Sequence, residues 1–172
     1  MMAIVDVLEE LPAAHPRRDA VIAALGDVAE AVAKVQDADS GLWWQILDQG
    51  SRAGNYLEAS ASSMFVYAIA KGVRMSVLDG ALLQVAQRGH AGLVERLVEV
   101  DETGIVTLNG VCAVAGLGGT PYRDGSYAYY VGEPRQPNDY KGAGPFILAS
   151  LEIESVANNA AEQREGTWAL QV

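Results

Sequence analysis

The segment "NYLEASASSMFVYAIAKGVR", residues 55–74, decides the class of fold that this sequence predicts. Its pattern has the helical period, which places Met64, Tyr67, Ala68 and Lys71 on successive turns. Many of its other residues are small, and small side chains allow two helices to approach closely. We therefore expect a helix here that packs tightly against neighbouring helices.

Further helical segments lie on both sides of residues 55–74. One runs from the amino terminus to Pro12, and the next begins near Pro16, a residue that suits a first helical turn. Short and long connections alternate between the segments, as they do in stacked helix hairpins. The sequence therefore predicts an all-α fold, with an irregular tail. The expected helices span residues 1–12, 15–37, 55–74, 79–100 and 144–159.

The composition narrows the classes of function. The 172 residues suffice for one domain, and half of them are apolar. A net charge of −10 repels nucleic acid and anionic membranes. No apolar run reaches the ~20 residues that a bilayer requires, and acidic residues interrupt the segment where a signal peptide would be apolar. We expect a cytoplasmic protein with neither nucleic acid nor membrane as partner.

Metal and thiol chemistry find little support in the sequence. His15 and His90 are far apart and match no metal-ligand spacing, and the chain has one cysteine, Cys112. Because Cys112 lies in the apolar run 111–114, a buried inert thiol is favoured over a nucleophile. We expect no metal and no cofactor.

Two long connections, residues 41–55 and 118–142, carry most of the residues suited to binding. Loops of this length are usually functional, and the hairpin pattern places both at the same end of the helices. On an extended segment Trp43 and Trp44 point to opposite faces, so one can be buried while the other stacks on a sugar; alternatively, both are packed inside. Glu58 either forms a capping box with Asn55 or faces a cleft.

The end of the second connection offers a similar choice. Asn138 and Asp139 can cap the last helix, whose first turn tolerates Pro145. Lys141 can instead bind a carboxylate near the positive helix start. Spacing alone singles out no acid–base pair among the carboxylates. The candidates are Glu58, Asp124 and Asp139.

Two stretches together resemble a known family. They are "GLWWQILDQGSRAGNYLEASASSMFVYAIAKGVR" (residues 41–74) and "AGLGGTPYRDGSYAYYVGEPRQPNDYKGAGPFILASLEIE" (residues 115–154). They carry, in order, the blocks G-L-W-x-Q, N-x-L-E-x-S, R-D-G-S-Y-x-Y-Y and N-D-x-K-G-x-G-P-F. The chain resembles the unsaturated rhamnogalacturonyl hydrolases and the related unsaturated glucuronyl hydrolases, glycoside hydrolase families 105 and 88. The likeness covers residues 3–154.

The resemblance implies an (α/α)6 barrel, of which this chain looks like the C-terminal half. Residues 1–156 would form the helical hairpins of about half a barrel, and residues 157–172 a tail. It also implies a reaction. An aspartate of the family protonates the C4=C5 double bond of an unsaturated uronic residue from pectin and activates water for attack at C5, without metal or cofactor. No residue here matches that aspartate, so we assign none as catalytic.

The positions of the long loops place eight residues near the sugar end of such a barrel. These substrate-binding candidates are Trp43, Trp44, Asn55, Glu58, Arg123, Tyr129, Asn138 and Lys141. Two functions remain open: part of an enzyme that hydrolyses unsaturated oligosaccharides, or a non-catalytic carbohydrate-binding or scaffold half-barrel. The expected partners are an unsaturated oligosaccharide and either a second copy or an N-terminal half that covers an apolar seam. The seam residues are Ile4, Leu8, Leu11, Phe146, Ile147 and Leu151.

Overall fold

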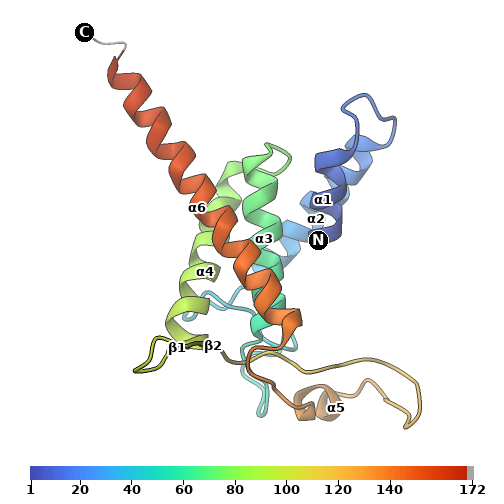
Figure 1. The fold of residues 1–172 in the computed structure, drawn as a ribbon. Coiled ribbons are helices and arrows are strands. Elements are labelled where there is room, and N and C mark those ends of the chain that lie inside the picture. The colour runs from blue at the N-terminus through green and yellow to red at the C-terminus, as the bar shows by residue number, and fades with distance from the viewer. Residues whose placement is uncertain (170–172) are drawn as a thin grey trace.

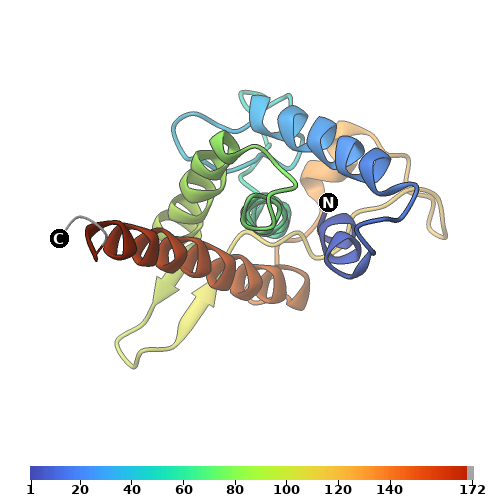
Figure 2. The ribbon, with the colours of Figure 1, turned by 90° about the horizontal axis from the view of Figure 1, so that it is seen from above.

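Helix α3 (Ala59–Arg74) lies at the centre of the fold, with the other long helices around it (Figure 2). The computed structural model describes residues 1–169, and the side chains of residues 1–158. Within that range the chain is mostly helical, as the sequence predicts. The other helices are α1 (Met2–Glu10), α2 (Arg18–Lys34), the 3-10 helix η1 (Gly80–Leu82), α4 (Leu83–Leu97), α5 (Tyr127–Gly132) and α6 (Tyr140–Ala169).

Glycines allow α4 to pack closely. A Cβ atom at Gly92 would lie 2.1 Å from the carbonyl oxygen of Ser40, and one at Gly89 would lie 2.7 Å from Val66 of α3. On its other side α4 contacts α6, where the His90 ring stacks on the partly buried Phe146. Glycines of α4 thus set its distance from α3 and from the loop that carries Ser40.

Ion pairs hold the ends of the helices together. Lys71 of α3 is buried, and its ammonium lies 2.7 Å from Asp6 and 2.8 Å from Glu9 of α1. Arg74, one turn further along α3, donates two hydrogen bonds to Glu152 of α6, at 2.6 and 2.9 Å. Helices α1 and α6 are therefore both fixed to α3 at the end away from the long loops.

Several element boundaries differ from those expected. The helix expected over 79–100 ends at Leu97, because the following β-branched valines form strand β1 (Val98–Val100). This strand pairs antiparallel with β2 (Val106–Leu108), with Val98 opposite Leu108. Helix α5 within the long loop was not expected. Helix α6 begins before its expected start and continues to Ala169, so Pro145 lies inside it and the tail is helical up to that residue.

The expected apolar seam is partly covered by the chain itself. On α1, Leu8 is buried, and Ile4 and Leu11 are partly buried against the core. On α6, Ile147 and Leu151 are 59% and 55% exposed. The part of the seam that faces solvent therefore belongs to α6.

The long loops gather at one end of the helices, as expected. Figure 1 shows the start of α3, helix α5, the β1–β2 hairpin and the start of α6 at this end. The ring of Tyr127 in α5 contacts the Arg52 guanidinium at 3.6 Å, which joins the two long loops. In residues 1–169, no helix has the length and apolar character to cross a membrane.

Candidate functional site

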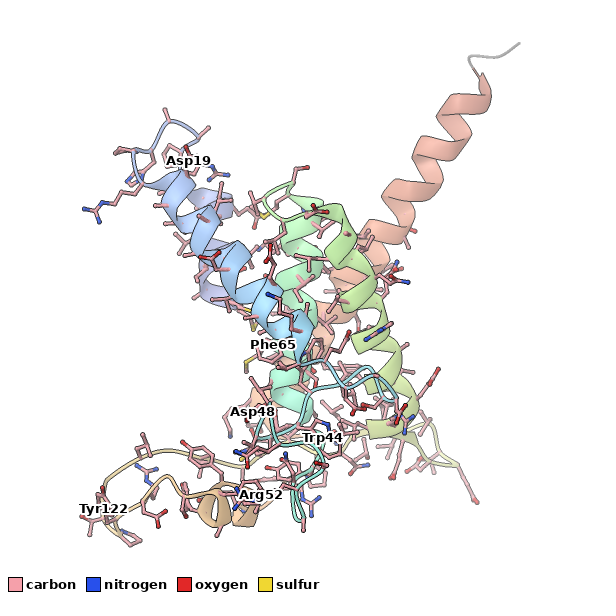
Figure 3. All side chains as sticks on the ribbon, turned by 180° about the vertical axis from the view of Figure 1, so that it is seen from behind. Asp19, Trp44, Asp48, Arg52, Phe65 and Tyr122 are labelled. Carbon is pink, nitrogen blue, oxygen red and sulfur yellow. The ribbon has the colours of Figure 1, made fainter. Side chains whose placement is uncertain are left out.

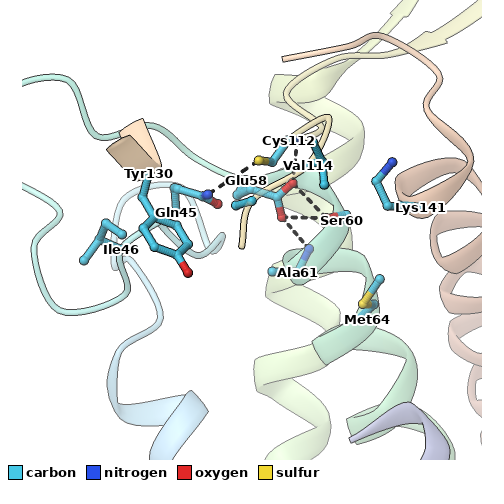
Figure 4. A pocket seen from close by; sticks show the side chains of 11 residues that line it. Gln45, Ile46, Glu58, Ser60, Ala61, Met64, Cys112, Val114, Tyr130 and Lys141 are labelled. Atoms are coloured by element: carbon cyan, nitrogen blue, oxygen red, sulfur yellow. Dashed lines mark hydrogen bonds between the residues drawn. The ribbon is translucent and has the colours of Figure 1, made fainter. Parts of the chain in front are cut away.

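A hollow of about 390 Å³ opens among the loops at the start of α3 (Figure 4). The two long loops, the first turns of α3 and the start of α6 all border it. We call it the Lys141 hollow. Its lining residues are Gln45, Ile46, Glu58, Ser60, Ala61, Met64, Cys112, Val114, Ala115, Tyr130 and Lys141.

Glu58 is buried at the wall of this hollow and is the N-cap of α3. Its carboxylate accepts hydrogen bonds from the backbone N–H of Ala61, from the Ser60 hydroxyl and from the backbone N–H of Cys112. The first of these satisfies a free N–H of the first helical turn. The capping role is confirmed for Glu58, although in a different form from the predicted box.

Asn55 does not cap α3, which corrects the expected capping box. Its side chain accepts from the backbone N–H of Ile46 and donates to the carbonyl oxygens of Ile46 and Gln49. It also accepts from the N–H of Tyr56. These four bonds hold the loop 46–56 in shape, so the amide is occupied by backbone and is not free to bind a sugar.

One of the two neighbouring tryptophans is buried and the other is partly exposed, which is one of the two alternatives predicted from the sequence. Trp43 is fully buried, donates from its indole to the carbonyl oxygen of Val32 at 2.8 Å, and packs edge-on against Phe65. Trp43 therefore belongs to the core, and its expected role in substrate binding is wrong. Trp44 is partly exposed, and its indole donates to Asp37 at 3.1 Å.

Lys141 lies at the start of α6 with its side chain half exposed. Its ammonium donates to Asp139 at 2.7 Å, and its backbone N–H donates to the same carboxylate at 2.9 Å. The Lys141 hydrogen bond lowers the pKa of Asp139. Asp139 thus caps α6 as expected and orients the ammonium at the edge of the Lys141 hollow.

Asn138, the expected partner of Asp139, has a different role. Its backbone has a positive φ of 54°, and its side chain accepts a hydrogen bond from the N–H of Leu108 at 2.7 Å. Its own N–H donates to the Leu108 carbonyl oxygen. Asn138 therefore connects the long loop to β2 and does not border the Lys141 hollow.

Arg123 and Tyr129 border a separate hollow of about 470 Å³ in the long loop, together with Tyr122, which lies near the outer tip of the loop (Figure 3). Arg123 donates to the carbonyl oxygen of Gly118 at 2.9 Å, so it supports the loop's own bend. Hydrogen bonding to Glu133 raises the pKa of Tyr129. The structure thus separates these two candidates from Glu58 and Lys141.

Sequence reasoning missed several residues of the Lys141 hollow. Gln45 donates from its amide to the Cys112 sulfur at 3.6 Å, and Tyr130 lies beside Tyr129 with ring centroids 5.3 Å apart. Both residues belong to sequence blocks that carry the family resemblance, G-L-W-x-Q and R-D-G-S-Y-x-Y-Y. Membership of these blocks was the signal that could have indicated them. Cys112 is buried, as expected. Within residues 1–158, no three His, Cys, Asp or Glu side chains gather to hold a metal ion.

The site thus combines amide, phenol, hydroxyl, ammonium and carboxylate groups around a partly apolar hollow, which suits a polar ligand. The chain matches the model of Glycosyl Hydrolase Family 88 over residues 1–157. It therefore belongs to this family of glycoside hydrolases.

Particular relatives agree with that assignment. A C. acetobutylicum ATCC 824 glycoside hydrolase from family 105 is 49% identical, with a TM-score of 0.87 over 90% of this chain and 43% of that one. A possible member of the GH105 family from Salmonella enterica is 28% identical, with a TM-score of 0.72 over 90% of this chain and 38% of that one.

A curated relative, protein Atu3128 of Agrobacterium fabrum, is 41% identical over 88% of this chain and 66% of its own length. The "24.9 kDa protein in picA locus" of Rhizobium radiobacter matches to the same extent. The chain therefore spans slightly less than two thirds of these relatives and less than half of the solved structures.

Proposed function

We propose that this chain forms part of a glycoside hydrolase that acts on unsaturated uronic-acid oligosaccharides from the breakdown of pectin, in particular rhamnogalacturonan. The observation that carries the proposal is the Lys141 hollow, in a chain that is 49% identical to a family 105 glycoside hydrolase. The helices would contribute about half of an (α/α)6 barrel, since they align with 43% of that relative.

Lys141 is the group proposed to recognise the acidic sugar. Asp139 holds the ammonium at the start of α6, where the helix dipole also favours a negative ligand. A uronate carboxylate in the hollow would pair with this ammonium. The Gln45 amide and the Tyr130 hydroxyl border the same space and would form hydrogen bonds with sugar hydroxyls.

Hydration of the C4=C5 double bond also requires a proton donor and a base for water. Glu58 is the acidic residue among those that line the hollow, and its carboxylate already accepts hydrogen bonds from Ser60, Ala61 and Cys112. Asp139 is engaged by Lys141. We therefore propose that the acid of the reaction is not among the residues of this chain, and that these residues bind and orient the sugar.

The test uses the 172-residue chain and the disaccharide of unsaturated galacturonic acid and rhamnose. We expect calorimetry to detect binding, and we expect no loss of the ultraviolet absorbance of the double bond. Proton transfer by a positioned side chain typically contributes about 10²–10⁴-fold, so its absence should be evident. Turnover that disappears in Glu58→Gln or Asp139→Asn would show that the acid lies in this chain.

The same observation favours a second candidate, a carbohydrate-binding module without catalysis. Both readings predict binding by this chain alone. They differ when an aspartate-bearing N-terminal half of a family 105 relative is added, because only an enzyme part should then restore turnover. No turnover in the mixture, despite confirmed association of the two parts, would support the binding module.

A further inference from the structure

A second hollow, of about 490 Å³, lies on the other face of the segments that border the Lys141 hollow. Neighbouring residues of an extended segment point to opposite sides. Trp44 and its bridge partner Leu57 line the second hollow, whereas Gln45 and Glu58, the residues that follow them, line the first. We call it the Trp44 hollow. Its lining residues are Trp44, Tyr56, Leu57, Leu97, Asn109, Gly110, Arg135 and Pro137.

Backbone hydrogen bonds make the frame of this hollow rigid. Trp44 pairs with Leu57 as an antiparallel bridge. The segment 134–136 pairs with 111–113, through N–H groups of Ala113 and Gln136 that each donate at 2.8 Å. Backbone pairing between segments far apart in the chain therefore holds the lining residues in place.

Two contacts fix the Trp44 ring within this frame. Its indole N–H donates to Asp37, and Gly50 lies so close that a Cβ atom there would be 2.5 Å from the indole nitrogen. One side of the ring is thus packed against backbone, while the residue remains partly exposed in the hollow. A fixed, partly exposed aromatic ring is a suitable surface for the apolar C–H face of a sugar.

Arg135 supplies a cation at the same hollow. It is exposed, and its guanidinium lies 4.8 Å from the centroid of the Tyr56 ring, a cation–π contact that orients it. Within the described side chains, no carboxylate forms an ion pair with Arg135 and no hydrogen bond occupies its guanidinium. Asn109 also lines this hollow. A guanidinium with no carboxylate partner of its own can bind a ligand carboxylate in bidentate fashion.

We propose that the Trp44 hollow is a second carbohydrate site, which binds an acidic sugar of a saturated uronate oligosaccharide. Trp44 would contact the sugar ring and Arg135 its carboxylate. This goes beyond the proposed function, because it concerns a different surface and a ligand without the double bond. Such a site would keep the chain bound to an acidic polysaccharide while the other hollow binds an end of it.

The experiment measures binding of trigalacturonate to the full 172-residue chain by calorimetry and by the NMR signal of the Trp44 indole N–H. That signal is assigned by its loss in Trp44→Phe. We expect it to shift on titration. We expect Arg135→Gln to weaken binding by about tenfold or more, the size expected for a charged hydrogen bond. Arg17→Gln, a change at an exposed arginine outside both hollows, is the matched control and should bind like the wild type.

The methyl-esterified trisaccharide separates charge from ring stacking. It should bind at least about tenfold more weakly, because its carboxyl groups carry no charge for Arg135. Equal affinity for the ester, unchanged affinity in Arg135→Gln, or an unshifted Trp44 signal would each overturn the proposal. Lys141→Met should leave trigalacturonate binding to the Trp44 hollow intact. Failure of this site is therefore distinguishable from failure of the proposed function.

Discussion

The carboxylate of Glu58 accepts a hydrogen bond from the backbone N–H of Cys112 at 2.9 Å, across 54 residues of sequence. The same carboxylate caps α3 through Ala61. One side chain therefore joins the start of the central helix to the base of the long loop, and the wall of the Lys141 hollow depends on both contacts.

Replacement of Glu58 should destabilise the protein in proportion to the acceptors lost. Glu58→Ala removes a cap, worth about 0.5–2 kcal/mol, and leaves a buried N–H at Cys112 unsatisfied, at a cost of about 1–3 kcal/mol. We expect a total loss of about 2–4 kcal/mol in urea denaturation. Glu58→Gln keeps one acceptor and should lose less. Equal effects of the two changes would contradict the role of the carboxylate oxygens.

Replacement of glycine by alanine should have opposite effects on stability at two positions, Gly26 and Gly92. In Gly26→Ala the new Cβ meets nothing within 4 Å in the middle of α2, so stability should rise by up to about 1 kcal/mol from helix propensity. In Gly92→Ala the new Cβ would clash with the carbonyl oxygen of Ser40, so α4 and the loop that carries Ser40 must move apart. We expect a loss of about 1–3 kcal/mol there. Thermal unfolding of both variants checks the prediction, and a loss in Gly26→Ala would count against it.

The Lys71 cluster should make stability fall in acid. Burial raises the pKa of Asp6, but hydrogen bonds from Lys71 and Tyr67 outweigh this and lower it; the Lys71 hydrogen bond likewise lowers the pKa of Glu9. Carboxylates with lowered pKa stabilise the fold above their unfolded values of about 4 and lose this contribution as pH falls through the folded values.

The pH dependence of Lys71→Met provides the measurement. In this variant the difference in unfolding free energy between about pH 7 and about pH 3, a range in which carboxyl groups titrate, should be smaller than in the wild type. It should not vanish, because other hydrogen bonds lower the pKa of Asp37 and Asp101 as well. Lys34→Met, a change at an exposed lysine, should leave the acid dependence unaltered.

Loss of the Lys141 ammonium should weaken binding of the unsaturated disaccharide. We expect Lys141→Met to raise the dissociation constant by about tenfold, the effect of one charge-assisted hydrogen bond. Lys34→Met is again the control. A dissociation constant that stays the same in Lys141→Met would remove Lys141 from the proposed site.

The exposed face of α6 should mediate association. Ile147 and Leu151 are each more than half exposed, and contiguous apolar patches on soluble proteins commonly mark interfaces. We expect a dimer in sedimentation at micromolar concentration, and a shift to monomer in the double variant Ile147→Gln, Leu151→Gln. Val28→Gln, at an exposed valine of α2, should have no effect. A wild-type chain that is monomeric at all concentrations would show that this face needs no second copy.

The helices could be predicted from the sequence because their apolar spacing is local information. The gathering of the long loops at one end followed from the alternation of connection lengths. The end of α4 was misplaced because Val98 and Val100 fit a helical pattern and a strand equally well, and pairing with β2 decided between them.

The candidate site was less predictable, since hydrogen-bond partners are set by tertiary contacts. Asn55 looked like a helix cap, but the loop around it folds back and takes all its bonds. Asn138 instead accepts a hydrogen bond from the N–H of Leu108 in β2, a residue 30 positions away in the sequence. Gln45 and Tyr130 end two of the sequence blocks, but nothing local to them shows which side of the loop they face.

The alternation of Trp44 and Gln45 makes the length of this loop a constraint on the evolution of the family. Insertion or deletion of a single residue within either extended stretch, 43–45 or 56–58, would reverse the faces, and the indole and the amide would exchange places. Homologues that keep both hollows should therefore conserve the spacing within these two stretches, next to α3, and vary in length only in the loop that joins them. The alternation of side chains along this short stretch, more than any one residue type, therefore keeps the two hollows on opposite faces.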